Sequence, residues 1–209
     1  MSQIKIIAIE TTGRSPRARR LRFDHAEPRL TCSSVVKLLG LGEGDVWDEQ
    51  RLAEALQEAE PELAKERAFR MLGYRERSRH ELLCGLVDDG YSPHTADAVV
   101  DRLEEIALVD DVRFSTMWAR SRVRAGFDRR RIRRELEEKG VDPAIIAEAL
   151  DEAAPAEDSL ERARAALRGR RATDRAGRDK LVRRLVSRGF DLQTAIAAAS
   201  AQDGDDTPA

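Results

Sequence analysis

The chain has few aromatic residues, only two cysteines and no long apolar run. Aromatic residues make up 4% of its 209 residues, which argues against the exposed stacking platforms of single-strand nucleic-acid binders. Cys32 and Cys84 stand far apart, so neither a disulfide framework nor a Cys-x-x-Cys metal site is expected. The first residues carry no secretory signal and no apolar run is long enough to span a membrane. We therefore expect a cytoplasmic protein without membrane contact.

Motifs for catalysis, metals and cofactors are also lacking. His25, His80 and His94 are scattered and form no metal-ligand pattern, so we expect no bound metal and no cofactor. Neither a nucleophile elbow nor a phosphate-loop sequence occurs. Asp110 and Asp111 precede a predicted helix and fit its N-cap and first turn better than a catalytic carboxylate pair. The sequence predicts a protein that acts by binding and is not an enzyme.

Charge is arranged in blocks of alternating sign, although the net charge is only −2. Residues 43–66 carry nine acids against two bases, a net charge of −7. Residues 113–134 carry nine arginines against one acid, a net of +8, and residues 162–188 carry eleven bases against two acids, a net of +9. Residues 135–161, between these blocks, hold ten acids and one lysine. The pattern predicts localised basic faces.

Three segments align around a glycine and repeat one pattern. The glycines are Gly90, Gly140 and Gly189, at spacings of 50 and 49 residues. Apolar residues four apart make one face of a helix, and a glycine supplies the left-handed residue that ends it. Each glycine therefore predicts a corner between two helices. The apolar residues eight before, four before and one after the glycines are Leu82, Ile132 and Leu181, then Leu86, Leu136 and Leu185, then Tyr91, Val141 and Phe190.

Capping residues predict where the helices around each corner begin. Serine and aspartate side chains accept hydrogen bonds from the free amides of a first turn, and proline is tolerated best at its first position. After the corners, the predicted caps are Ser92, Asp142 and Asp191, followed by Pro93 and Pro143 in the first two copies. Before the corners, they are Ser78 with Glu81, then Asp128, then Thr173 or Asp174.

The predicted fold is mainly α, with three tandem three-helix repeats in an elongated array after a small N-terminal β-hairpin and helix segment. Strands are expected at residues 3–11 and 19–24, and helices at 33–39 and 48–60. In the helix that opens the second repeat, Phe114, Trp118, Ser121 and Ala125 are expected to share one face. The expected divisions are 1–60 for the N-terminal segment, 61–107, 108–153 and 154–202 for the repeats, and 203–209 for a disordered acidic tail.

Three motifs carry a family resemblance. They are Y-R-x-R-S-x-x-E-L from Tyr74 to Leu82, L-V-D-D-x-R-F from Leu108 to Phe114, and R-I-R-R-E-L-x-x-K-G from Arg131 to Gly140. Through them the chain resembles the RecX family over residues 62–152, and more weakly to about residue 200.

The resemblance implies a modulator that binds in the groove of the RecA–DNA filament. Such a protein suppresses ATP hydrolysis, strand exchange and the co-protease reaction, and so regulates homologous recombination, DNA repair and the SOS response. We expect a monomer whose partner is the RecA filament, with single- or double-stranded DNA contacted through its basic faces.

The candidate interface consists of arginines on the outward faces of the basic blocks, together with one loop. Guanidinium groups bind phosphate and carboxylate through paired hydrogen bonds, so these side chains could contact nucleic acid or an acidic RecA surface. The alternative is a solvated face neutralised by acids such as Glu137 and Glu138. The second repeat supplies Arg113, Arg120, Arg124, Arg130 and Arg134, and the third supplies Arg162, Arg168, Arg170, Arg171, Arg183 and Arg184. The first repeat supplies Tyr74, Arg75 and Arg77, where packing of Tyr74 against a neighbouring repeat and contact with a partner are both open.

Two other functions fit part of the pattern. A duplex-DNA-binding helix-turn-helix transcription factor would also place such corners beside arginine-rich helices. It needs base-reading side chains where the following helices begin, whereas these begin PHTADAVV, PAIIAEAL and LQTAIAAA. A passive helical scaffold is the third reading, and the basic blocks argue against it. Regulation of the RecA filament is the leading prediction.

Overall fold

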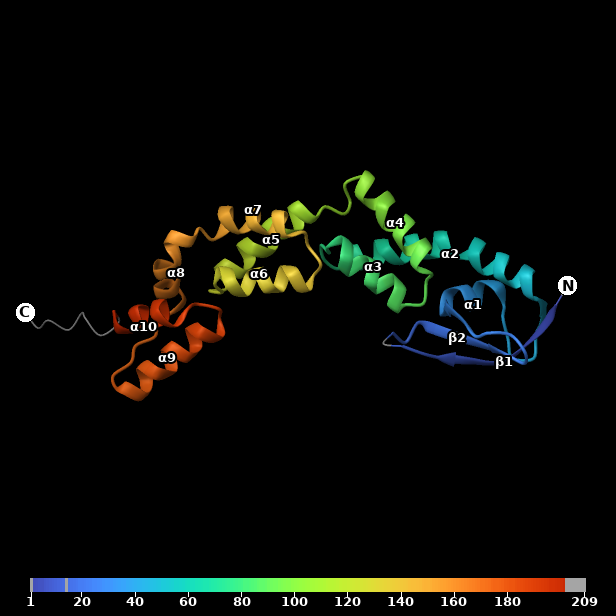
Figure 1. Ribbon diagram of the computed structural model, residues 1–209, viewed down its shortest axis with the longest axis horizontal. Helices are drawn as coiled ribbons and strands as arrows, with labels where there is room; N and C mark the ends of the chain where they lie inside the picture. The colour runs from blue at the N-terminus through green and yellow to red at the C-terminus, as the bar shows by residue number, and fades with distance from the viewer. Residues whose placement is uncertain (1, 14, 202–209) are drawn as a thin grey trace, which may run out of the picture. The chain divides into compact units, whose positions relative to one another are not determined.

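The computed structural model describes residues 2–13 and 15–201, so the acidic tail expected at 203–209 lies outside the described residues (Figure 1). The chain divides into two compact units, one ending at Asp110 and the other beginning at Asp111. Within the described ranges, no helix combines the length and the apolar character that a membrane span requires.

The first unit contains a four-stranded antiparallel sheet. Its strands are β1 (Gln3–Thr11), β2 (Ala18–Phe23), β3 (Arg29–Cys32) and β4 (Val46–Asp48), in the order β3-β2-β1-β4. The predicted hairpin is confirmed as β1 and β2. Strands β3 and β4 were not predicted, because four and three residues are too few for a recognisable alternation of apolar and polar side chains.

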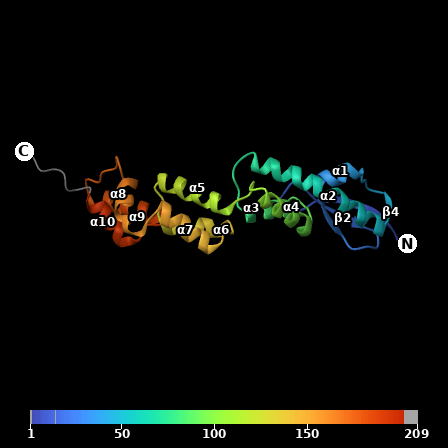
Figure 2. The same cartoon turned by 90° about the horizontal axis from the view of Figure 1, so that it is seen from above.

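Two helices cover one face of this sheet, as both views of the unit show (Figures 1 and 2). Helix α1 (Ser33–Leu39) contacts β2 and β3, and α2 (Glu49–Leu72) begins directly after β4. Ile4 and Ile6 alternate along β1 and are buried with Leu21 of β2 beneath these helices. The period-two pattern of the strands thus produces the core.

Helix α2 continues for 24 residues through Pro61. The predicted boundary at residue 60 is therefore wrong, because it falls inside this helix. A proline in a helix interior removes one backbone hydrogen bond and usually ends the helix. Here burial recurs every four residues on both sides of the proline, which keeps one face in contact with the core. The buried positions are Leu52, Leu56, Glu60, Ala64 and Ala68.

Three-helix repeats follow, as predicted. The first is completed by α3 (Arg79–Asp88) and α4 (Pro93–Glu105), which pack on the second half of α2. The second comprises α5 (Asp111–Arg124), α6 (Arg129–Glu138) and α7 (Pro143–Ala153). The short 3-10 helix η1 (Ala156–Asp158) leads into the third, which comprises α8 (Ser159–Ala166), α9 (Arg175–Ser187) and α10 (Leu192–Ser200).

The repeat glycines form the expected corners. Gly90, Gly140 and Gly189 have φ angles of 100°, 69° and 100°, the left-handed region that glycine adopts without strain. All nine apolar residues predicted around them are buried. Side-chain oxygens of the predicted capping residues accept backbone N–H groups, with Asp174 as the cap in the third copy. These caps are Ser78, Asp128 and Asp174 before the corners, and Ser92, Asp142 and Asp191 after them.

The second and third repeats each have a separate apolar core within the second unit. In α5 the buried side chains are Phe114, Ser115 and Ala119, with Trp118 half-buried. The prediction that Ser121 and Ala125 share this face is wrong, since both are exposed. The buried face of α5 includes Ser115 and Ala119, each one position after an expected residue, because α5 packs chiefly against α7.

Candidate functional site

Six arginines line one hollow of the second unit, and we call it the six-arginine hollow. Its volume is about 370 Å³, and it opens between the end of α5, the α8 segment and the end of α9. None of the described acidic side chains lines it. The sequence analysis had singled out five of these residues, and the structure brings them together with a sixth, Arg188. The arginines are Arg124, Arg162, Arg168, Arg170, Arg184 and Arg188.

A second basic depression, the α6–α9 groove, lies beside the same end of α9. Arg130, Arg131 and Arg134 line its α6 side, and residues 186, 187 and 189 line its other side. The two repeats approach closely here, because a Cβ built on Gly189 would lie 2.6 Å from the Cβ of Arg131. Only glycine allows this approach. Arg130 and Arg134 are exposed and form no ion pair among the described residues.

Neighbouring acids neutralise other arginines of the basic block in the second repeat. Arg120 on α5 pairs with Glu152 on α7, and Arg129 pairs with Asp151 at 2.6 Å. The solvated-face alternative therefore holds for Arg120. Arg113 is half-buried and lines neither of the two basic depressions. The residues that remain available are Arg124, Arg130 and Arg134.

A buried carboxylate joins α5 to α6 and was missed by the sequence analysis. Glu135 accepts hydrogen bonds from Arg122, from Arg131 and from the indole of Trp118. Burial alone would raise the pKa of Glu135, but the hydrogen bonds from Arg122 and Arg131 outweigh burial, and the pKa is lowered. Arg122 also lies 4.9 Å above the Trp118 ring and 4.8 Å above that of Phe127. These residues hold the second repeat together.

In the first unit, two arginines of the predicted loop have structural partners. Arg75 donates to both carboxylate oxygens of Glu81 at 2.9 Å, and this pairing raises the pKa of Arg75. Arg77 donates to the carbonyl of Met71 at 3.2 Å and so caps the end of α2. Burial lowers the pKa of Arg77, and repulsion from Arg75 adds to the effect.

Tyr74 lies in the same loop. Its side chain is 85% exposed, so it does not pack into the core of the first unit. Phe69, near the end of α2, is 43% exposed. The first unit therefore presents two aromatic side chains to solvent near the end of α2.

The remaining predicted arginines of the third repeat lie outside both basic depressions. Arg171 is exposed in the segment before α9. Arg183 is exposed on α9, and its Nε donates to the carbonyl of Asp179. Arg188 was missed, although comparison of the three copies held a signal. The residue before the repeat glycine is Asp89, then Lys139, then Arg188, and each of these carries a charge.

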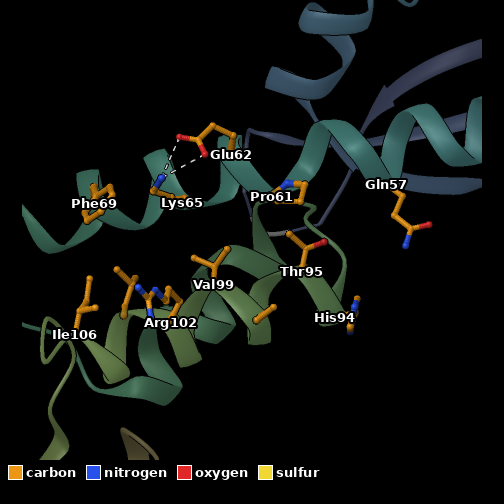
Figure 3. A pocket seen from close by; sticks show the side chains of 12 residues that line it. Gln57, Pro61, Glu62, Lys65, Phe69, His94, Thr95, Val99, Arg102 and Ile106 are labelled. Carbon is orange, nitrogen blue, oxygen red and sulfur yellow. Dashed lines mark hydrogen bonds and ion pairs between the residues drawn. The ribbon is translucent and has the colours of Figure 1, made fainter.

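An apolar groove of about 600 Å³ lies between α2 and α4 of the first unit (Figure 3). Figure 3 shows side chains from the two helices facing each other across it. Phe69, Val99 and Ile106 supply apolar surface, and Lys65 at the rim is paired with Glu62. The sequence analysis did not anticipate this groove, because Pro61 had been taken as the start of a separate helix.

Residues 2–13 and 15–201 contain no group of three or more histidine, cysteine, aspartate or glutamate side chains placed to hold a metal ion.

Family models match both units. The model described as the first three-helix domain of RecX matches residues 64–103, and that of the second three-helix domain matches residues 110–150. These ranges correspond to the first repeat and to the helices of the second.

Curated relatives and solved structures agree with these matches. The regulatory protein RecX of Halorhodospira halophila is 37% identical over 153 residues, which cover 71% of this chain and 93% of the relative. That of Mycolicibacterium smegmatis is 37% identical over 150 residues, covering 68% and 80%. A crystal structure of regulatory protein RecX aligns with a TM-score of 0.55 at 22% identity, covering 91% of this chain and 96% of that one. The RecX structure from Lactobacillus salivarius aligns with a TM-score of 0.53 at 20% identity, covering 69% and 97%. The structural likeness supports the fold alone.

Proposed function

The chain belongs to the RecX family of regulatory proteins, and from this premise we propose that it regulates the RecA recombinase by binding the RecA–DNA filament. Binding lowers the rate of ATP hydrolysis by the filament and its strand-exchange and co-protease activities. The protein acts by occupying the filament and catalyses no reaction itself.

The observation that carries this proposal is the pair of arginine-lined depressions in the second unit. A filament presents DNA phosphates and acidic protein side chains, and both are ligands that guanidinium groups bind through paired hydrogen bonds. Arg124, Arg130 and Arg134 lie at these depressions without an ion pair among the described residues. Exposed arginines attract a polyanion and orient it on approach.

Rigid local packing supports the same function. The Arg122–Glu135 cluster fixes α5 against α6, which carry the free arginines. The backbone N–H of Asp128 donates to the carbonyl of Arg188 at 2.9 Å and joins the second repeat to the third. A site built on packed helices keeps its geometry when a ligand binds, so less ordering entropy is lost.

The first test is DNA-dependent ATP hydrolysis by RecA from the same organism, titrated with this protein. We expect inhibition at ratios well below one protein per RecA monomer, which indicates that filament growth is blocked. Absence of inhibition at saturation, with filaments confirmed by electron microscopy, would remove the proposal. Selection of duplex sequences from a random pool would then test the transcription-factor alternative.

A matched pair of variants tests the surface. Arg130→Glu/Arg134→Glu should weaken inhibition and reduce its sensitivity to salt, since two contacts with the polyanion are lost. Lys37→Glu/Arg51→Glu changes the net charge equally at two exposed positions of the first unit and is the control. Equal loss of inhibition by both variants would mean that overall charge, and not this surface, governs binding.

A further inference from the structure

The six-arginine hollow holds more positive charge than the fold itself requires. Arg162 has partners, since it donates to the carbonyl of Pro155 at 2.5 Å and to the carboxylate of Asp128 at 3.4 Å. Arg188 donates to the carbonyl of Gly126 at 3.4 Å and has no carboxylate partner among the described residues. Among the described residues, the other four arginines of the hollow form no ion pair. Structural arginines elsewhere in the chain, such as Arg122 and Arg129, are paired with carboxylates.

Two donors of the hollow are buried and unsatisfied. The Nε atoms of Arg162 and Arg184 are removed from solvent and have no hydrogen-bond partner among the described residues. A buried donor that lacks an acceptor destabilises a folded protein, so these two arginines are held in place at a cost to stability. An anion in the hollow would offset the mutual repulsion of the arginines that line it and have no carboxylate partner.

The backbone places these charges together by close contacts. Gly126 has a φ of 79°, and a Cβ at this position would lie 2.5 Å from Nη1 of Arg188. The guanidinium of Arg188 also lies 5.7 Å from the centre of the Phe127 ring. Burial lowers the pKa of Arg188, and repulsion from Arg184 and Arg170 lowers it further. The cations are therefore held near one another although they repel.

The arrangement around α9 favours a chain of anions over a single small one. Arg184 and Arg188 face the six-arginine hollow. Their neighbours in the sequence, residues 186, 187 and 189, line the α6–α9 groove. Two basic depressions thus border the same end of one helix. A carboxylate can be bound by one guanidinium, but five arginines without a carboxylate partner, beside Arg162 with its partner Asp128, match a ligand that carries successive charges.

We propose that the six-arginine hollow is a binding site for the phosphate backbone of nucleic acid. This proposal rests on the proposed function and deepens it, because it names DNA phosphate as the part of the filament that the second unit binds. Arg184 and Arg188 are the inner contacts, and Arg124, Arg168 and Arg170 bind at the rim. Phosphate contacts carry no sequence information, so binding should be independent of base sequence.

The test is binding of a fluorescein-labelled oligothymidylate to the full chain, measured by anisotropy without RecA between about 50 and 200 mM salt. Arg184→Gln and Arg188→Gln should each weaken binding roughly tenfold, the effect of one charge-assisted hydrogen bond. Each should also reduce the slope of log affinity against log salt by about one. Arg164→Gln on α8 and Arg175→Gln on α9 remove the same charge from exposed positions outside the hollow and serve as controls. These controls should change the affinity by less than about threefold.

Stability separates a binding role from a structural one. Arg184→Gln removes a buried unsatisfied donor and one repelling charge, so its urea midpoint should equal or exceed that of the wild type while DNA affinity falls. Arg184→Lys keeps the charge but loses the planar fork and should restore binding only in part. A lower midpoint for Arg184→Gln together with unchanged affinity would assign the residue to the core and overturn the proposal.

The remaining outcomes distinguish the ligand and the function. Equal losses in hollow and control variants would overturn the site, because diffuse charge would explain binding. Competition by inorganic phosphate or pyrophosphate at constant ionic strength, without binding of oligothymidylate, would replace the backbone by a free anion and also overturn it. Hollow variants that bind DNA normally yet no longer inhibit RecA would overturn the phosphate site and leave filament regulation intact. Wild-type protein that binds DNA through the hollow without inhibiting RecA would support the site and contradict the proposed function.

Discussion

The guanidinium of Arg122 donates its Nε and Nη2 hydrogens to the two carboxylate oxygens of Glu135, at 2.6 and 3.0 Å. The carboxylate is 8% exposed, and it accepts further hydrogen bonds from Arg131 and Trp118. When a buried ion pair with complete hydrogen bonding loses either partner, the protein is destabilised, because the remaining charge is left uncompensated. This pair therefore controls the integrity of the second repeat, on which both basic depressions depend.

Removing the partner of Glu135 should destabilise the second unit. We expect Arg122→Met to lower the free energy of unfolding by about 2 kcal/mol, because Arg131 and Trp118 only partly compensate the buried charge. In a Trp47→Phe background the fluorescence of Trp118 reports this unit alone, since the chain has two tryptophans. Arg120→Met, which removes an exposed pair with Glu152, is the control and should change stability by about 0.5 kcal/mol or less. Equal effects of the two variants would show that the buried pair has no special weight.

The lowered pKa of Glu135 predicts how the free energy of unfolding changes as the pH falls. A carboxyl group whose pKa is lower when folded stabilises the protein above its ordinary unfolded pKa, and that contribution is lost as the pH falls through the folded value. Between about pH 6 and pH 3 the wild type should lose more stability than Glu135→Gln, whose side chain does not titrate. Urea unfolding at a series of pH values measures this difference. Parallel curves for the two proteins would contradict the assignment.

The glycine corners, the caps and the buried face of each middle helix could be predicted from sequence, because they depend on local spacing. Gly90 and Leu86 reveal a helix end by themselves, without knowledge of any distant contact. The passage of α2 through Pro61 could not be predicted, because it depends on burial against the sheet. The partner of Arg122 is Glu135, which lies on the next helix, thirteen positions further along the chain. The six-arginine hollow likewise requires the packing of two repeats.

Gly90 makes a closer approach than its role as a helix end requires. Its φ is 100°, and a Cβ there would lie 2.1 Å from the carbonyl oxygen of Thr31, which belongs to β3. Gly90→Ala should therefore lower the free energy of unfolding by about 3 kcal/mol or more, because a sheet backbone cannot move aside cheaply. Gly40→Ala is the matched control, with a φ of 63° and open space around it, and should cost about 1 kcal/mol. Chemical denaturation of both variants measures the difference, and equal values would contradict the close contact.

Tyr74 offers a test of the first unit that is free of stability effects. Because its side chain is 85% exposed, Tyr74→Ala should change the free energy of unfolding by about 0.5 kcal/mol or less. If the loop contacts the filament, the concentration for half-inhibition of RecA should rise roughly tenfold, the loss of one aromatic anchor. Leu38→Ala, at a 62% exposed position of α1, is the control. Unchanged inhibition by Tyr74→Ala would exclude this loop from the interface.

The uninterrupted path of α2 decides how the protein can be divided. The buried stripe of α2 packs against the sheet near the start of the helix and against the other two helices of the first triplet near its end. The sheet and the first triplet therefore share a single core. A cut at residue 60 would leave two fragments with exposed apolar surface, so neither fragment should fold when it is moved to another protein. The smallest portable piece of the N-terminal half is the whole of the first unit. The second and third triplets have separate cores but meet where Gly189 packs on Arg131, so the second unit is best moved whole.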